Sequence, residues 1–167
     1  MVLDILVAPD PRLKIKARPV EIFDVDLQKT VTDLLETLSY VDGVGLAATQ
    51  VGINQRIIVV DADEENHGVG KAEAYINPEI IHISEGKKLS REGCFSVPDF
   101  YEEVSRAEKV TVRYQDPQGQ FCEKTATGLL GVCLQHEIDH LNGVLFIDYL
   151  SRLKRDRILT KLKKHKT

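Results

Sequence analysis

Apolar positions in the first half of the chain predict a helix and then a buried strand. Beyond Asp24, apolar residues recur at the 3.6-residue spacing of a helix, and Gly43 ends this pattern. The helical positions are Leu27, Val31, Leu34, Leu35, Leu38 and Val41. Residues 43–52 are rich in small side chains, and residues 56–61 form the continuous apolar run that is typical of a buried strand.

The middle of the chain has the pattern of strands joined by turns. Residues 73–91 predict one or two strands, interrupted at an Asn-Pro pair, and residues 92–98 predict a turn or loop. Apolar and polar residues alternate over residues 109–114, and a second strand is expected at residues 120–126. The turn signal Asp-Pro-Gln-Gly at 116–119 joins these two segments, so we expect a β-hairpin here.

Two further helices are predicted in the last quarter of the chain. Residues 128–141 have a helical pattern that Asn142 and Gly143 end. After a short apolar segment, a final amphipathic helix carries its apolar residues among many basic ones, at Leu150, Leu153, Ile158, Leu159 and Leu162. Hairpins together with separate helices indicate an α+β domain.

Composition and charge are those of a globular protein with a basic end. We find no repeat or linker and expect residues 1–167 to form a single domain. No apolar run approaches the roughly 20 residues of a membrane span, and the first residues do not resemble a signal peptide, so we expect a cytoplasmic protein without membrane contact. Residues 152–167 hold eight of the 22 Lys and Arg residues but one acid.

The clearest candidate chemistry is the H-E-x-x-H pattern within the predicted helix at 128–141. His136 and His140 lie one helical turn apart on the same face, so both imidazoles can reach one metal ion. Glu137 lies about 100° around the helix, where it can take a proton from metal-bound water. We therefore expect antiparallel strands and hairpins packed around a central metal-binding helix, with the amphipathic helix at the C-terminus.

A catalytic metal site needs a third protein ligand and one open position. Many metalloproteases take this ligand from downstream of the motif, but here no histidine follows until His165 in the tail, and Asp148 is the only nearby carboxylate. Upstream, Cys94 follows a glycine in a predicted loop, and a thiolate is stabilised outright by a dication. Cys122 belongs to a predicted strand and Cys133 to the helix face, so Cys94 is the best candidate.

Three segments together resemble one enzyme family. They are GVGLAATQ at residues 43–50, EGCFS at 92–96 and QHEIDH at 135–140. In this order and spacing they are similar to the motifs of peptide deformylases, and the likeness extends over nearly the whole chain, with the length of the compact bacterial type. Deformylases are hydrolases that remove the N-formyl group from newly made polypeptides during protein biosynthesis and N-terminal methionine processing.

The resemblance implies a role for each motif. Cys94, His136 and His140 would be the metal ligands, with water at the fourth position and Glu137 as general base and then acid. Gln50 and the backbone N–H of Phe95 would stabilise the oxyanion. The glycines and alanines near Gln50 would let a formylmethionyl peptide pair with the backbone as an added strand.

The resemblance also implies a substrate pocket with supporting charges around it. The residues expected to bind the methionine end of the substrate are Val44, Gly45, Leu129, Val132 and Cys133. Glu92 and Arg106 are expected to support the site, with Arg106 paired to Asp139. Two positions depart from the family pattern: Phe95 replaces the more common leucine, and Tyr101 stands where some members carry an arginine. These departures bear on packing and peptide preference.

The sequence is compatible with more than one metal, with a ribosomal partner and with two other functions. The ligand set suits zinc by its softness, whereas the resemblance implies Fe²⁺, with Zn²⁺, Ni²⁺ or Co²⁺ able to replace it. A zinc endoprotease of the H-E-x-x-H type is a second hypothesis, and a structural metal protein with Cys133 as fourth ligand is a third. The basic C-terminal helix is a candidate surface for docking to the phosphate-rich ribosome.

Overall fold

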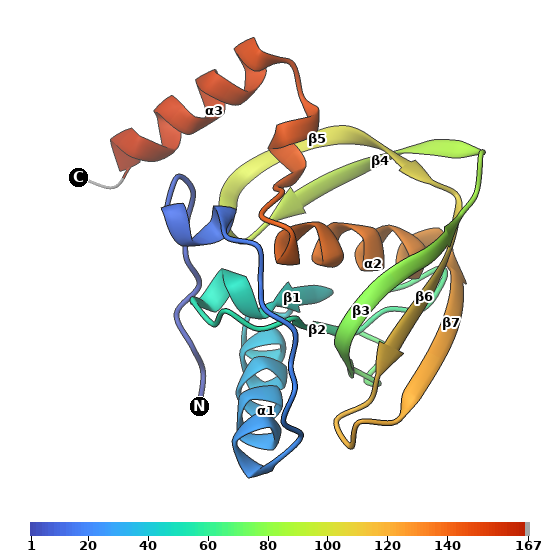
Figure 1. The fold of residues 1–167 in the computed structure, drawn as a ribbon. Helices are drawn as coiled ribbons and strands as arrows, with labels where there is room; N and C mark the ends of the chain where they lie inside the picture. Colours follow the sequence, from blue (N-terminus) through green and yellow to red (C-terminus); the bar gives the residue numbers. More distant parts are fainter. Residues whose placement is uncertain (166–167) are drawn as a thin grey trace.

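The computed structural model describes residues 1–165, so Lys166 in the basic C-terminal segment lies outside the described residues. Figure 1 shows the helices and strands in chain order. The α-helices are α1 (Val25–Tyr40), α2 (Gly128–Leu141) and α3 (Arg152–His165). Short 3-10 segments are η1 (Pro11–Lys14), η2 (Ala48–Val51) and η3 (Phe146–Tyr149).

The strands form two antiparallel sheets. The larger sheet has the order β1-β2-β3-β6-β7, and the smaller one is the β4–β5 hairpin. The strands of the larger sheet are β1 (Gly45–Ala47), β2 (Ile57–Val60), β3 (Glu73–Ile83), β6 (Lys109–Gln115) and β7 (Phe121–Thr127). The hairpin consists of β4 (Lys87–Cys94) and β5 (Val97–Ala107). Strand β1 therefore lies at one edge of the larger sheet.

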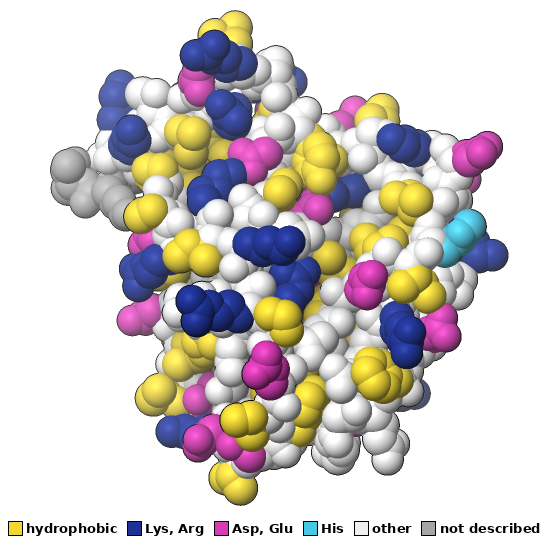
Figure 2. All heavy atoms as spheres, in the orientation of Figure 1, with side chains coloured by type: hydrophobic (Ala, Val, Ile, Leu, Met, Phe, Trp, Pro, Cys, Tyr) yellow, Lys and Arg dark blue, Asp and Glu magenta, His cyan; other side chains and the backbone are white. Residues whose placement is uncertain are grey.

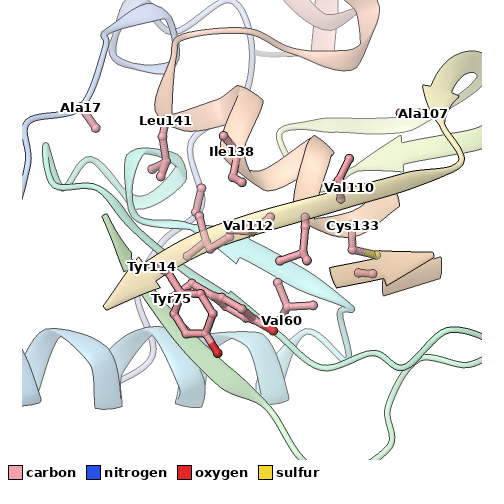
Figure 3. Packing of buried hydrophobic residues seen from close by; sticks show 14 residues of the cluster. Ala17, Val60, Tyr75, Ala107, Val110, Val112, Tyr114, Cys133, Ile138 and Leu141 are labelled. Atoms are coloured by element: carbon pink, nitrogen blue, oxygen red, sulfur yellow. The ribbon is translucent and has the colours of Figure 1, made fainter. Parts of the chain in front are cut away.

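Helix α2 lies between the two sheets, with the β4–β5 hairpin on one side and the larger sheet on the other (Figure 1). Its buried residues Leu134, Ile138 and Leu141 belong to an apolar cluster with Val110 and Val112 of β6. Figure 3 shows Ile138 and Leu141 of this cluster together with the two valines. This burial removes from water the apolar surface of the helix that faces the larger sheet. The predicted α+β fold with a central helix is confirmed.

The predicted helices and the hairpin predicted at residues 109–126, which is β6–β7, agree closely with the structure. Helix α1 begins after Asp24, whose side chain accepts a hydrogen bond from the backbone N–H of Leu27 at 3.1 Å and so caps the helix. Helix α2 has the predicted bounds. In the β6–β7 hairpin, the side chain of Asp116 accepts bonds from the backbone N–H groups of Gln118 and Gln120, which closes the predicted turn.

Two expectations about the strands were right in kind but wrong in their bounds. The turn predicted at residues 92–98 is confined to residues 95–96, because β4 continues to Cys94 and β5 begins at Val97. Two strands do cover residues 73–91, but β3 continues past Asn77 and Pro78 with a register irregularity, and the break between the strands lies at residues 84–86. Asn77 adopts a positive φ of 52°, and its side chain bonds both the N–H and the C=O of Val20. These side-chain bonds stabilise the irregular backbone within the strand.

Helix α3 packs on the rest of the protein through part of its apolar face. Ile158 and Leu162 are buried in a cluster with Leu13, Val97 and Phe146. In contrast, Leu153 near the start of the helix is 69% exposed, although the amphipathic pattern placed it on the apolar face. Within residues 1–165, no helix combines the length and the apolar character that crossing a membrane requires.

Candidate metal centre

Helix α2 and the end of β4 bring three ligand atoms together. The Nε2 atoms of His136 and His140 are 3.3 Å apart, and the Cys94 Sγ lies 3.3 Å from His140 Nε2. All three atoms lie within 4.8 Å of one another. The two histidines are buried and the cysteine is partly buried. The structure therefore assembles the three residues that the sequence predicts as metal ligands.

The spacing of these atoms fits a small divalent ion. A tetrahedral ion that binds two imidazole nitrogens at about 2.0–2.1 Å holds them about 3.3 Å apart, which matches the separation of the two Nε2 atoms. Three protein ligands leave one position open, as in a catalytic site. Cys133 is not part of this cluster within residues 1–165, so the structural-metal hypothesis lacks its fourth ligand.

A buried carboxylate sets the orientation of His136. Glu92 accepts a hydrogen bond from His136 Nδ1 at 2.8 Å, which leaves the Nε2 lone pair free for a metal. Arg106 donates two hydrogen bonds to the same carboxylate, from Nε at 2.6 Å and from Nη2 at 2.7 Å. Burial by itself raises the pKa of Glu92, but the bonds from Arg106 and His136 hold that pKa below its usual range. Glu92 therefore stays ionised beside the metal site.

Arg106 also links the Glu92 carboxylate to Asp139 on α2. Arg106 Nη1 donates to Asp139 at 2.7 Å, so the predicted pairing of Arg106 with Asp139 is confirmed. Tyr149 donates its hydroxyl to the same Asp139 oxygen at 2.7 Å, and the Arg106 guanidinium lies over the Tyr149 ring. The sequence pattern does not indicate Tyr149, because a 3-10 segment beyond the helix brings it to the site.

Glu137 is buried beside the two histidines. Its Oε1 has no hydrogen-bond partner within residues 1–165, and the carboxylate lines a cavity that His136 also lines. Burial raises the pKa of Glu137 to about 7, against the lowering effect of nearby His136. A carboxylate with such a pKa can both accept and return a proton near neutral pH.

Gln50 is held in place from both ends of its side-chain amide. Its Oε1 accepts the backbone N–H of Ala47 at 2.9 Å. Its Nε2 donates to Ser96 Oγ at 3.1 Å and lies 3.4 Å from the Cys94 Sγ. An amide donor is thereby fixed next to the ligand set without the entropy cost of ordering a free side chain. The contact with Ser96 was not anticipated, although Ser96 belongs to the motif at 92–96.

A cavity of about 480 Å³ opens beside these residues. The predicted substrate residues all line it: Val44, Gly45, Leu129, Val132 and Cys133. Phe95, in the turn of the β4–β5 hairpin, also lines the cavity and is 40% exposed, and Tyr101 does so at 59%. Sequence reasoning missed His67, which reaches the cavity from a loop without a motif, and Arg91, which directly precedes the motif at 92–96 on β4.

Comparison with known proteins agrees with this geometry. The sequence profile of polypeptide deformylase matches residues 2–156. The chain belongs to the polypeptide deformylase family. It is 53% identical to the peptide deformylase of Alkalilimnicola ehrlichii over 163 residues, which cover 98% of this chain and 90% of that protein.

Solved deformylase structures share the fold. A peptide deformylase from Ehrlichia chaffeensis superposes with a TM-score of 0.93 at 41% identity, covering 100% of this chain and 98% of the other. The Ehrlichia chaffeensis enzyme in complex with actinonin gives a TM-score of 0.92 at 42% identity, covering 98% and 97%. Membership in the deformylase family excludes the endoprotease hypothesis, and it makes the chain a hydrolase with a metal site at Cys94, His136 and His140.

Proposed function

We propose that this chain removes the N-formyl group from the N-terminal formylmethionine of newly made polypeptides and releases formate, with Glu137 as the proton carrier. The observation that carries the proposal is the position of the buried Glu137 carboxylate, which has an unpaired oxygen beside the ligand cluster. Cys94, His136 and His140 would hold the divalent ion. Bound there, the ion would make water a stronger nucleophile and polarise the formyl carbonyl.

Glu137 acts twice in the proposed reaction. The carboxylate first takes a proton from the attacking water, whose oxygen forms a bond to the formyl carbon. It then returns this proton to the methionine nitrogen as the C–N bond breaks, so that formate and a free amine leave. Its burial supports this role, because burial places its pKa between those of an ordinary carboxyl and an amine.

Gln50 and Phe95 are proposed to stabilise the negative charge that develops on the formyl oxygen. The Gln50 Nε2 group is already oriented toward the ligand cluster, so it needs no rearrangement when the charge appears. Phe95 follows Cys94 in the hairpin turn, and its backbone N–H is the second proposed donor. Its side chain packs near Gly43, where a Cβ would lie 2.7 Å from the ring. Gly43 therefore leaves room for the Phe95 ring, which is larger than the leucine that is more common at this position.

The methionine side chain is proposed to enter the cavity, with the peptide backbone pairing as an added strand. Val44, Leu129, Val132 and Cys133 line the cavity with apolar surface that suits a thioether. Strand β1 pairs with β2 on one side only, so its other edge offers backbone N–H and C=O groups to an extended peptide.

The proposal is tested with anaerobically purified protein and formyl-Met-Ala-Ser, by measuring the amine released and the metal content. We expect Glu137→Gln to lower kcat by about 100- to 10,000-fold, because it removes general base catalysis, while the metal content stays the same. Glu123→Gln on the exposed surface of β7 is the matched control. Full activity in Glu137→Gln would disprove the assigned mechanism.

The ligand assignment has a separate test. Cys94→Ser is expected to lose most of its bound metal, because it replaces a thiolate with a weakly binding hydroxyl. Cys122→Ser, in β7 and outside the cluster, is the control and should retain the metal. Equal metal content in both variants would remove Cys94 from the ligand set.

Ferrous iron is the ion that we propose for the cell. The support is the family likeness, since a Cys-His-His set also accepts Zn²⁺, Ni²⁺ or Co²⁺. We expect anaerobically purified protein to contain iron and to lose activity in air, whereas protein reloaded with Ni²⁺ keeps its activity. Stoichiometric zinc with full activity that is insensitive to air would contradict iron.

The exposed side of α3 is proposed to dock on the ribosome surface, close to where nascent chains emerge. Figure 2 shows Lys and Arg side chains gathered over α3. Arg157 and Lys163 are exposed there, while Ile158 and Leu162 hold the helix on the protein. Basic groups favour a phosphate-rich surface through counterion release.

The docking proposal is tested by sedimentation of the enzyme with ribosomes at several salt concentrations. The double variant Arg157→Gln/Lys163→Gln should bind more weakly and with less salt dependence than the unchanged enzyme. Lys29→Gln/Lys71→Gln removes the same charge from surfaces elsewhere and should bind normally. Equal ribosome binding by both double variants would refute docking through α3.

A further inference from the structure

The mouth of the active-site cavity carries an arginine that has no part in the mechanism above. Arg91 on β4 lines the cavity and, among the described residues that do so, it is the sole Lys or Arg. Its guanidinium carbon lies 5.6 Å from the centre of the Tyr101 ring on β5. This is within the range of a cation–π contact. The arginine and the tyrosine thus form one unit at the cavity mouth.

Gly93 makes room for this unit. Arg91 and Gly93 of β4 both lie close to the Tyr101 ring. A Cβ at Gly93 would lie 2.5 Å from the edge of the Tyr101 ring. The ring therefore covers bare backbone at Gly93, next to the guanidinium. Tyr101 is 59% exposed in this position and offers its ring as a platform at the surface.

The Arg91 guanidinium keeps its hydrogen-bond donors available. Within residues 1–165 it forms no ion pair, although Glu103 is its register partner on β5. Glu102, the next acid on β5, is paired with Lys154 of α3 at 3.3 Å. Arg106 is the opposite case, since its guanidinium is satisfied by the buried Glu92 carboxylate and by the partly exposed Asp139 carboxylate. An unpaired guanidinium at the mouth of a cavity is a ready binder of a carboxylate.

The position of Arg91 along β4 indicates which part of a peptide it meets. At about 3.3 Å per residue, Arg91 lies about 10 Å along the strand from Cys94. An extended peptide with its formyl group at the ligand cluster spans this distance with about three residues. A peptide that pairs with the edge of β1 and also runs alongside β4 from the ligand cluster would bring its third residue to Arg91.

We propose that Arg91, supported by Tyr101, is a specificity-determining residue that favours an acidic side chain at the third position of the formyl peptide. The proposal rests on the proposed deformylase function. A carboxylate at this position accepts hydrogen bonds from the guanidinium, whereas a lysine is repelled by it. Because the contact is exposed to solvent, the effect on kcat/KM is modest and decreases with added salt.

The test compares kcat/KM for formyl-Met-Ala-Glu-amide, formyl-Met-Ala-Gln-amide and formyl-Met-Ala-Lys-amide. Each value is normalised to that of formyl-Met-Ala-amide, which lacks a third residue. The amide ends remove the terminal carboxylate, which would otherwise bind the same guanidinium. We expect the Glu peptide to exceed the Lys peptide by about threefold to fivefold in the unchanged enzyme at low salt.

Variants separate this contact from a general effect on the enzyme. Arg91→Gln should abolish the preference and Arg91→Glu should reverse it, which loss of folding cannot do. Tyr101→Ala should weaken the preference and Tyr101→Phe should preserve it, because the ring provides the support. Arg113→Gln removes an arginine that lies over the Phe121 ring and does not line the cavity, and this control should keep the preference.

The outcomes distinguish this inference from the function on which it rests. Equal rates for the three longer peptides, or a preference that survives Arg91→Glu, would overturn the role of Arg91 while leaving the deformylase function intact. Absence of activity on every formyl peptide, including formyl-Met-Ala-amide, would instead refute the proposed function itself.

Discussion

At the scale of single residues, the position of Glu137 on α2 depends on the absence of a side chain at Gly45 of β1. A Cβ on Gly45 would lie 2.7 Å from Glu137 Oε2 and 2.9 Å from its Cγ. Such distances are too short for real contacts, so one of the two groups would have to move. Gly45 is thus needed because the Glu137 side chain approaches its backbone closely. A special backbone conformation is not the reason, since Gly45 does not adopt a positive φ.

We predict that Gly45→Ala lowers kcat by about 100-fold, since displacing a catalytic group by about 1 Å has an effect of this size. The metal content and the thermal midpoint should change little, because the glycine is not among the ligands. Kinetics on formyl-Met-Ala-Ser together with metal analysis would check this. Unchanged kcat in Gly45→Ala would show that Glu137 tolerates the displacement.

At the scale of elements, one buried ion network joins β4, β5 and α2. Arg106 of β5 pairs with Glu92 of β4 and with Asp139 of α2, and both Arg106 and Glu92 are almost fully buried. A buried charge that loses its partner is strongly destabilising, whereas the intact pair adds little net stability. The network therefore serves mainly to hold the β4–β5 hairpin in register with the helix that carries both histidines.

We predict that Arg106→Met lowers the free energy of unfolding by about 3–5 kcal/mol, because it leaves the Glu92 carboxylate buried and unpaired. Metal affinity should fall by about 10- to 100-fold, since the carboxylate that orients His136 is disturbed. Urea unfolding and metal competition with a chelator would measure the two effects. In the double variant Glu92→Gln/Arg106→Met, stability should recover in part. A double variant no more stable than Arg106→Met would argue against an unpaired charge as the cause.

At the scale of the whole molecule, the two ends of the chain support the hairpin that carries Cys94. Leu13 near the N-terminus and Ile158 of α3 are buried in the same cluster as Val97 of β5, and Cys94 packs against this cluster. The C-terminal helix is thus part of the core and is also the proposed docking surface. Removal of the whole helix would therefore expose the core, and substitutions on its outer face test docking more cleanly.

We predict that Ile158→Ala lowers the free energy of unfolding by about 2–5 kcal/mol, the usual effect of deleting a large buried aliphatic side chain. Leu153→Ala, five residues earlier in the helix and 69% exposed, should change it by less than about 0.5 kcal/mol. Urea unfolding midpoints of the two variants provide the comparison. Equal effects would mean that α3 does not dock on the core as the structure shows.

Removal of the metal is expected to affect the stability of the whole molecule, because the ligands come from two elements, β4 and α2. An ion that binds only the folded state at 100 times its Kd contributes about 2.7 kcal/mol. We expect chelation to lower the thermal midpoint by about 5–10 °C, given about 2–4 °C for each kcal/mol in a protein of this size. The midpoint of Cys94→Ser should respond little to the chelator. An equal response in both proteins would contradict ligation by Cys94.

Local patterns predicted a large part of this protein. The 3.6-residue period identified α1 and α2, the turn residues at 116–119 identified the β6–β7 hairpin, and H-E-x-x-H placed two ligands on one face of a helix. These features depend on residues close together in the sequence, so their physical basis is visible there. The third ligand, Cys94, was proposed from its neighbours and from the family likeness, because its distance from the helix does not appear in the sequence.

Other features were decided by tertiary structure alone. Residues 92–98 have the composition of a loop, yet pairing with β5 extends β4 as far as Cys94. The approach of Gly45 to Glu137, the link from Tyr149 through Asp139 to Arg106, and the stacking of Arg91 on Tyr101 each join residues from different elements. The sequence by itself determined the helices, one hairpin and the chemistry of the ligands. The fold decided which carboxylate is buried, which arginine is left unpaired and how the cavity is shaped, because these depend on contacts between distant segments.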